Sequence, residues 1–166
     1  SGQEVLALVA KKEYDAILLD ISMPGKSGLE VLKELKALNP KIPVLILSIY
    51  PEEQYAIRAL KAGASGYLTK ASAPDELISA IRKVSRGGKY ISLSLAEKLA
   101  YELDGDTEKA PHETLSDREY QILLLIASGK TVSDIAGEMC LSVKTVSTYR
   151  ARILDKMKLK NNAELT

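Results

Sequence analysis

The chain lacks tryptophan and phenylalanine, and its 166 residues include one cysteine and one histidine. Although eight tyrosines remain, these absences remove the usual aromatic platform for stacking the bases of single-stranded nucleic acid. Cys140 has no cysteine to pair with, and we expect it to be a small buried residue in the last turn of a helix. A single histidine, His112, excludes a histidine-rich metal cluster and a histidine-dependent catalytic triad.

Long apolar runs are also absent. No run approaches the roughly 20 residues of a membrane-spanning helix, and no signal peptide opens the chain. With 46% hydrophobic and 27% charged residues, the composition is typical of one or two small globular domains. Together with the low cysteine content, these features favour a cytoplasmic protein without a membrane partner.

The charge is nearly balanced over the whole chain, with a formal net value of +1, but it is unevenly distributed. Residues 142–160 contain six cations and one acid, whereas residues 97–113 contain six acids and two lysines. A positive segment in a nearly neutral protein is the electrostatic footprint of a DNA-binding protein. The alternative is a solvated helix with a few additional lysines.

The positive segment belongs to a stretch, 131–160, that predicts two short helices joined by a tight turn. Thr131 and Ser142 are suitable N-caps, because a short side-chain oxygen can accept from the free amides of a first helical turn. Apolar residues recur at helical spacing in both helices: Ile135, Ala136 and Met139, then Val146, Ile153, Leu154 and Met157. This pattern is that of a helix-turn-helix whose second helix can enter the DNA major groove.

The first half of the chain alternates between helical patterns and short apolar runs. Strands are predicted at 15–20, 43–48 and 66–70, because continuous apolar runs of this length suit a parallel sheet covered on both faces. Helices are predicted at about 2–12, 27–38, 51–62 and 74–86. This order predicts an α/β doubly wound parallel sheet, followed by an all-α helix-turn-helix domain.

Each predicted strand ends in a polar residue: Asp20, Ser48 and Lys70. Because the carboxyl ends of parallel strands line the ligand crevice of an open sheet, we expect these side chains to converge. A carboxylate nucleophile, an ammonium group and a hydroxyl suit phosphoryl transfer, with Lys70 and Ser48 contacting the phosphoryl oxygens. The alternative is that strand ends are polar simply because they are exposed.

Several segments carry a resemblance to a known family. DAILLDISMPGKSGLEVL, VLILSIY and KAGASGYLTK resemble the receiver domain of two-component response regulators. LSDREYQILLLIASGKTVSDIAGEMCLSVKTVSTYRARILDKM resembles the LuxR-type helix-turn-helix domain. Together they are similar to the NarL/FixJ family of response regulators, and the resemblance covers essentially the whole chain.

The resemblance implies roles for individual residues. Asp20 matches the phosphoacceptor, Lys70 the phosphate-pairing lysine, Ser48 the switch hydroxyl and Tyr67 the switch aromatic. Asp20 and Ser22 match positions that hold Mg²⁺, the latter through its backbone carbonyl. The implied function is a DNA-binding transcriptional regulator, phosphorylated by a sensor histidine kinase and acting as a homodimer.

Two departures from the family pattern lead us to expect a fragment. A receiver normally has a strand, a helix and a second strand before the helix that opens this chain, and the first strand ends in an acidic pair that completes the Mg²⁺ site. With Asp20 as the one matched carboxylate, we expect the ion to bind poorly. The segment NNAELT would begin the family's final helix.

We predict a receiver domain at 1–90, a linker with a short helix at 91–114, and a LuxR-type domain at 115–166. Leu95, Leu99 and Leu103 give the short helix one apolar face, and 104–114 is predicted to be a flexible, polar connection. Ser116 and Glu119 form a capping box at the start of the last domain, so Glu119 is predicted to be structural.

Helical spacing places small residues at the positions that contact bases in the resembled family: Ser147, Thr148 and Ala151. Direct readout would then depend on hydroxyl hydrogen bonds and contact with thymine methyl groups. We expect the larger side chains to hold phosphates. The predicted DNA-binding residues are Lys144, Thr145, Ser147, Thr148, Tyr149, Arg150, Ala151 and Arg152.

Two other functions remain as alternatives. A phosphohydrolase could use Asp20 as its nucleophile, but the second acid that such enzymes carry two residues later is replaced by Ser22. A regulator could also act through protein contacts alone, independently of phosphate.

Overall fold

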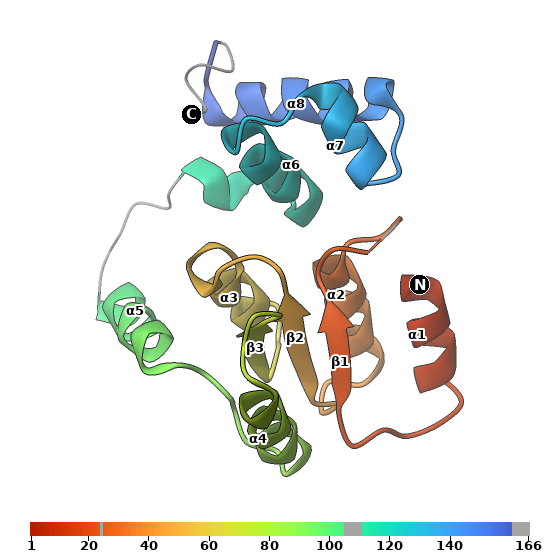
Figure 1. Cartoon of the computed structure of the whole chain (residues 1–166), viewed down its shortest axis with the longest axis vertical. Coiled ribbons are helices and arrows are strands. Elements are labelled where there is room, and N and C mark those ends of the chain that lie inside the picture. Colours follow the sequence, from red (N-terminus) through yellow and green to blue (C-terminus); the bar gives the residue numbers. More distant parts are fainter. Residues whose placement is uncertain (24, 105–110, 161–166) are drawn as a thin grey trace. The chain divides into compact units, whose positions relative to one another are not determined.

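The structure, a computed structural model, describes residues 1–23, 25–104 and 111–160. It divides into two compact units, Ser1–Gly105 and Asp106–Thr166, which are considered separately (Figure 1). The segment 161–166, in which we expected the start of a further helix, lies outside the described residues.

The first unit is built on a parallel sheet of three strands in the order β1-β2-β3 (Figure 1). They are β1 (Ile17–Asp20), β2 (Val44–Ser48) and β3 (Gly66–Thr69). The apolar runs of the sequence correctly predicted all three, with slightly longer bounds. Each strand begins on the same side of the sheet, so all three carboxyl ends lie at one edge.

Four helices alternate with these strands: α1 (Gly2–Val9), α2 (Gly28–Leu38), α3 (Glu52–Lys61) and α4 (Pro74–Ser85). Leu45 of β2 and Leu68 of β3 pack against Ala80 and Val84 of α4 in one buried cluster. This arrangement confirms the α/β doubly wound prediction, because each crossover helix returns the chain to the sheet in parallel sense.

A further helix, α5 (Leu93–Asp104), packs against α3 in the same unit. Leu95 is fully buried in this contact, as its place on the apolar face predicts. Ser92 precedes α5: its Oγ donates to Oε2 of Glu52 at 2.6 Å and accepts from the N–H of Leu95 at 3.1 Å. The side chain of Leu103, predicted on the same face, lies outside the described residues.

The second unit is helical and consists of η1 (Pro111–Thr114), α6 (Asp117–Ala127), α7 (Val132–Glu138) and α8 (Val143–Met157). Ile122 of α6, Ile135 of α7, and Val146 and Ile153 of α8 are buried at its centre. The predicted N-caps are confirmed: Thr131 Oγ1 accepts from the N–H of Asp134, and Ser142 Oγ from that of Thr145.

Two predictions about this part of the chain were wrong. Residues 111–114 were assigned to a flexible connection, but they form the 3₁₀ helix η1, which packs against α8. The His112 ring lies 5.8 Å from that of Tyr120, and Thr114 Oγ1 donates to the carbonyl of Pro111. Residues 105–110 of the predicted linker lie outside the described residues.

Cys140 was expected to be a buried helical residue, but it is exposed. Helix α7 already ends at Glu138, and Met139, its C-cap, takes the buried position instead. Cys140 follows with φ +52°, the left-handed conformation that often terminates a helix. The turn therefore directs its side chain away from the shared core of α7 and α8.

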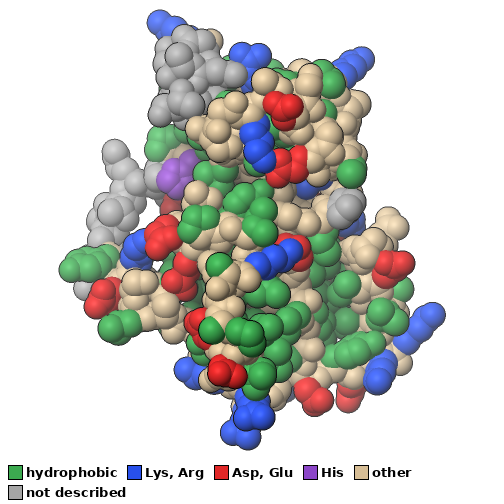
Figure 2. Space-filling view, viewed as in Figure 1, with side chains coloured by type: hydrophobic (Ala, Val, Ile, Leu, Met, Phe, Trp, Pro, Cys, Tyr) green, Lys and Arg blue, Asp and Glu red, His purple; other side chains and the backbone are tan. Residues whose placement is uncertain are grey.

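None of the helices in the described part of the chain is long and apolar enough to cross a membrane. Figure 2 shows both acidic and basic side chains on the visible face of each unit. Neither visible face therefore carries charge of one sign alone.

Candidate functional site

Asp20 occupies the end of β1, and both of its carboxylate oxygens accept hydrogen bonds. Lys70 Nζ donates to Oδ2 at 2.5 Å, and the backbone N–H of Ser22 donates to Oδ1 at 2.9 Å. Because Lys70 directly follows β3 while β2 lies between the two strands, the side chains meet across the carboxyl edge of the sheet. The structure thus brings together the carboxylate and the ammonium that the strand ends predicted.

Gly28 at the start of α2 allows that helix to approach the end of β1 closely. A Cβ at this position would lie 2.0 Å from the carbonyl oxygen of Asp20, so no other residue fits without a shift of the backbone. The N–H of Gly28 donates to the carbonyl of Ile21 at 3.0 Å. The start of α2 thereby lies directly against the backbone at the end of β1.

Ser48 ends β2 next to this pair, but its hydroxyl has a different partner. Its Oγ is buried and accepts from the backbone N–H of Tyr50 at 3.1 Å. Its carbonyl accepts from the N–H of Lys70 at 2.7 Å. Ser48 is therefore linked to Lys70 through the backbone and to the loop before α3 through its side chain.

Tyr67 on β3 is buried and reaches the same loop. Its hydroxyl donates to the carbonyl of Tyr50 at 2.8 Å. Burial raises the pKa of Tyr67 to about 12, despite a hydrogen bond with Ser48, so the hydroxyl stays protonated near neutral pH. Ser48 and Tyr67 thus hold the two sides of the Tyr50 residue, one at its N–H and the other at its carbonyl.

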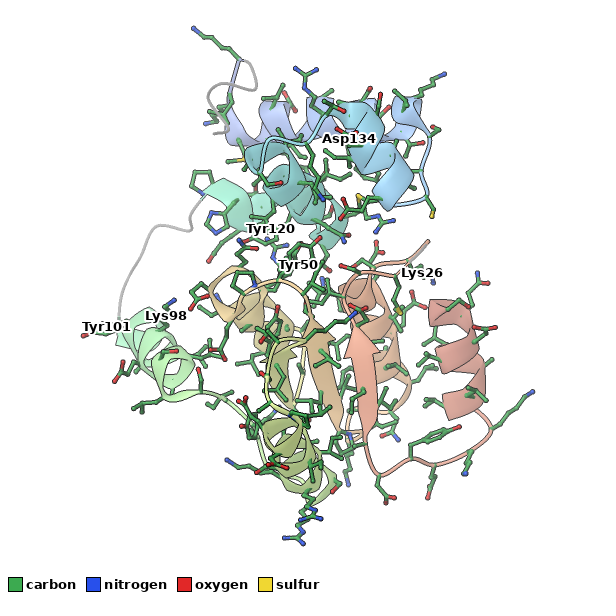
Figure 3. All side chains as sticks on the ribbon, viewed as in Figure 1. Lys26, Tyr50, Lys98, Tyr101, Tyr120 and Asp134 are labelled. Carbon is green, nitrogen blue, oxygen red and sulfur yellow. The ribbon has the colours of Figure 1, made fainter. Side chains whose placement is uncertain are left out.

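Sequence reasoning did not identify Tyr50. The residue lies just beyond the carboxyl end of β2, and Figure 3 labels it there. Its ring lies 4.9 Å from that of Tyr55 on α3. The signal that could have revealed it is its position two residues after the strand-end serine, on the loop that both Ser48 and Tyr67 contact.

The ligands available for a cation at this edge are few. Among the described residues, no group of three or more His, Cys, Asp or Glu side chains is placed to hold a metal ion. Ser22 Oγ is buried without a hydrogen-bond partner in the described structure, whereas Asp20 already accepts two hydrogen bonds. This set falls short of the near-octahedral oxygen ligation that Mg²⁺ prefers.

In the second unit, α8 presents a mostly polar face to solvent. The side chains of Lys144, Ser147, Thr148, Ala151 and Arg152 are exposed, whereas Thr145, Tyr149 and Arg150 are half-buried. An open hollow of about 310 Å³ on this face is lined by Lys144, Thr145, Thr148, Tyr149 and Arg152. The Arg152 guanidinium lies 6.0 Å from the ring centre of Tyr149, within the range of a cation–π contact.

One cation of α8 has a structural partner that the sequence did not suggest. Lys156 Nζ donates to Oε2 of Glu119 at 2.6 Å, and Glu119 also accepts from the N–H of Ser116. Burial alone would raise the pKa of Glu119, but these hydrogen bonds lower it below its ordinary value. The contacts confirm the capping box and the structural role of Glu119.

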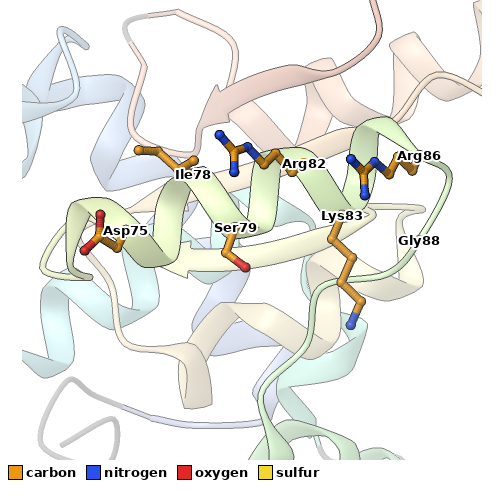
Figure 4. Close-up of a pocket in the computed structure, with 7 residues that line it drawn as sticks. All are labelled: Asp75, Ile78, Ser79, Arg82, Lys83, Arg86 and Gly88. Atoms are coloured by element: carbon orange, nitrogen blue, oxygen red, sulfur yellow. The ribbon is translucent and has the colours of Figure 1, made fainter.

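A wider hollow of about 650 Å³ runs along α4 and is lined by residues between Asp75 and Gly88. Arg82 and Arg86 lie on the same side of the helix one turn apart, and Lys83 points to the other side (Figure 4). Cations in the last turns of a helix compensate its dipole, which explains their presence without a ligand.

Both units match known protein families. Residues 1–82 match the response regulator receiver domain, and residues 113–166 match the bacterial regulatory proteins of the LuxR family. The chain is 38% identical to response regulator GacA of Pseudomonas aeruginosa, over 99% of this chain and 77% of that protein. It is 34% identical to response regulator UvrY of Escherichia coli, over 99% and 76%.

A solved structure supports the same relationship. The response regulator RcsB of Salmonella typhimurium, described for its conformational dynamism in DNA interaction, superposes with a TM-score of 0.52 at 25% identity. That match covers 99% of this chain and 79% of RcsB. The chain therefore belongs to the NarL/FixJ family of two-component response regulators, DNA-binding transcription regulators that combine a receiver domain with a LuxR-type helix-turn-helix domain.

Proposed function

We propose that Asp20 is the phosphoacceptor through which a sensor histidine kinase controls this regulator. The supporting observation is the Lys70 ammonium, 2.5 Å from Asp20 Oδ2 at the carboxyl edge of the sheet. An Asp20 oxygen attacks the phosphorus of a phosphohistidine, the P–N bond breaks, and the imidazole leaves and takes up a proton. Lys70 neutralises charge on the phosphoryl oxygens during this transfer.

Ser48 and Tyr67 act as the switch in this proposal. Once Asp20 carries a phosphoryl group, its oxygens offer the Ser48 O–H a new acceptor. Rotation of the Ser48 side chain toward them withdraws the Oγ that now accepts from the N–H of Tyr50. Loss of that hydrogen bond leaves Tyr50 held through its carbonyl by Tyr67 alone. The loop before α3 then has a second arrangement available, and phosphorylation shifts the population toward it.

Receiver domains generally bind Mg²⁺ for phosphorylation, and the ion supplies positive charge to the transferring group. In this chain the Asp20 carboxylate and the backbone carbonyl of Ser22 are the ligands we assign to it. Because they are so few, we expect the 166-residue polypeptide to bind Mg²⁺ weakly and to take up phosphate slowly.

We also propose that α8 enters the major groove of double-stranded DNA. Ser147, Thr148 and Ala151 face the bases, while Lys144, Tyr149, Arg150 and Arg152 hold phosphates, with Thr145 at the start of the helix. Two-fold-related half-sites call for a homodimer. Access to DNA and to the catalytic domain of a kinase implies the cytoplasm. We assign the receiver to 1–90 and the DNA-binding domain to 115–166; of the linker predicted at 91–114, η1 packs with the DNA-binding domain.

Intact-mass measurement tests the phosphoacceptor. The chain is incubated with Mg²⁺ and a small-molecule phosphodonor, and we expect a minor species heavier by one phosphoryl group. Asp20→Asn should abolish this species, whereas Asp15→Asn, a nearby carboxamide control outside the site, should leave it unchanged. Labelling that persists in Asp20→Asn would contradict the assignment.

In this proposal Asp20 accepts phosphate stoichiometrically, and the chain is not an enzyme. A phosphohydrolase would instead release inorganic phosphate continuously from the same donor. A regulator that acts through protein contacts alone, independently of phosphate, would bind DNA with the same affinity before and after phosphorylation of Asp20.

A further inference from the structure

The hydroxyl group of Thr148 is directed back onto its own helix. Its Oγ1 donates to the carbonyl of Lys144, one turn earlier in α8, at 2.9 Å. A carbonyl oxygen can only accept, so the hydroxyl proton is committed to this hydrogen bond. The Cγ2 methyl is then the part of this exposed side chain best placed to contact a partner.

The surroundings of Thr148 combine apolar and cationic groups. Ala151, three residues later on the same helical face, is also exposed and adds a second methyl group. Lys144 and Arg152 lie one turn before and one turn after Thr148, and all three line the same hollow. If Lys144 and Arg152 hold phosphates, the methyl groups of Thr148 and Ala151 lie over the bases between those phosphates.

We propose that Thr148 reads the 5-methyl group of thymine through its Cγ2 methyl, together with the Cβ of Ala151. In the major groove only thymine presents a methyl group, so an apolar contact there distinguishes it from the other three bases. The Thr148 hydroxyl serves the helix and makes no hydrogen bond to a base. This inference rests on the proposal that α8 enters the major groove. Of the two kinds of contact expected from the sequence, hydroxyl hydrogen bonds and thymine-methyl contact, it assigns the second to Thr148.

The hydrogen bond by itself is common, because threonine often bonds to the carbonyl four residues earlier in a helix. Thr148 is distinguished by its exposure on the second helix of a helix-turn-helix, between two cations. Ser147 provides a contrast: its exposed hydroxyl has no hydrogen-bond partner among the described residues and remains able to donate.

The test uses the full chain and a duplex selected from a random-sequence pool for tight binding. Each thymine is replaced in turn by deoxyuridine, which removes only the 5-methyl group. We expect one thymine in each half-site at which replacement weakens binding about fourfold, which corresponds to about 0.8 kcal/mol for one buried methyl group.

Two variants separate the methyl from the hydroxyl. Thr148→Val keeps both the shape and the Cγ2 position, so it should retain the wild-type sensitivity to deoxyuridine. Thr148→Ser keeps the hydroxyl and loses the methyl, so replacement of thymine by deoxyuridine should weaken its binding much less than that of the wild type. Circular dichroism of each variant checks that the helices are retained.

The proposal is overturned if no thymine is sensitive in the wild type, or if Thr148→Val loses affinity while Thr148→Ser does not. The second result would assign readout to the hydroxyl as an acceptor from adenine or cytosine. Failure of the proposed function would look different, because no duplex would then be enriched from the pool.

Discussion

At the scale of single residues, the contacts of Glu119 predict an effect of pH on stability. Its pKa is lowered in the folded chain, because hydrogen bonds from Lys156 and Ser116 outweigh the opposing effect of burial. A carboxyl whose folded pKa lies below its unfolded value contributes stability at higher pH and loses it as the pH falls through the folded pKa. The second unit should therefore lose part of its stability below about pH 4.5, the ordinary value of a glutamate.

Variants at this contact separate the charge from the cap. Glu119→Gln can still form a capping box, so it should lose only the ionic part and show a weaker dependence on acid. Glu119→Ala loses both and should cost about 1 kcal/mol more. Thermal unfolding of the full chain between pH 3 and 7 measures this, and equal acid sensitivity of wild type and Glu119→Gln would contradict it.

Some contacts of these residues could be predicted from the sequence, and others could not. Asp20 and Lys70 were predicted to meet because strand ends share one edge of the sheet, a consequence of topology alone. The Tyr50 contacts with Ser48 and Tyr67 depend on how one loop folds back, and no periodicity describes that. Cys140 was misplaced because α7 ends at Glu138, two residues before it.

At the scale of elements, α5 depends on a small contact with α3. Leu95 is 2% exposed, whereas Leu93 in the same helix is 78% exposed, so the pair gives a matched comparison. Leu95→Ala should destabilise the first unit by about 2–5 kcal/mol, because it removes buried apolar contacts and leaves a cavity. Leu93→Ala should change stability by less than about 0.5 kcal/mol.

Scanning calorimetry of both variants checks this prediction. Equal transition temperatures for Leu95→Ala and Leu93→Ala would show that α5 is not held on α3 in solution. The helix itself was predictable from its apolar spacing, but its partner was not. The Ser92–Glu52 hydrogen bond joins residues 40 apart, a distance over which sequence pattern carries no signal.

At the scale of the whole molecule, β1 is an edge of the described sheet, because it pairs only with β2 there. Leu18 on this strand is 42% exposed. An apolar edge with free backbone groups invites pairing with another chain. We therefore expect the 166-residue polypeptide to self-associate as its concentration rises.

Two exposed leucines allow this to be tested. Leu18→Lys should reduce association, because a charge on an edge strand opposes pairing. Leu38→Lys alters a leucine that is 63% exposed at the end of α2, away from the edge, and should have no such effect. Light scattering measures both, and a wild-type monomer at high concentration, or equal effects of the two variants, would argue against pairing through β1.

The central claim, that this regulator binds DNA through the cations of α8, is tested most directly by the salt dependence of its affinity. Fluorescence anisotropy with the selected duplex should give a linear fall of log K with log salt, with a slope of about −0.9 for each neutralised phosphate. Arg152→Ala should weaken binding and make the slope shallower by about one phosphate contact. Arg86→Ala, which removes the exposed arginine at the C-cap of α4, should leave both unchanged. An affinity independent of salt, or equal effects of the two variants, would contradict the account.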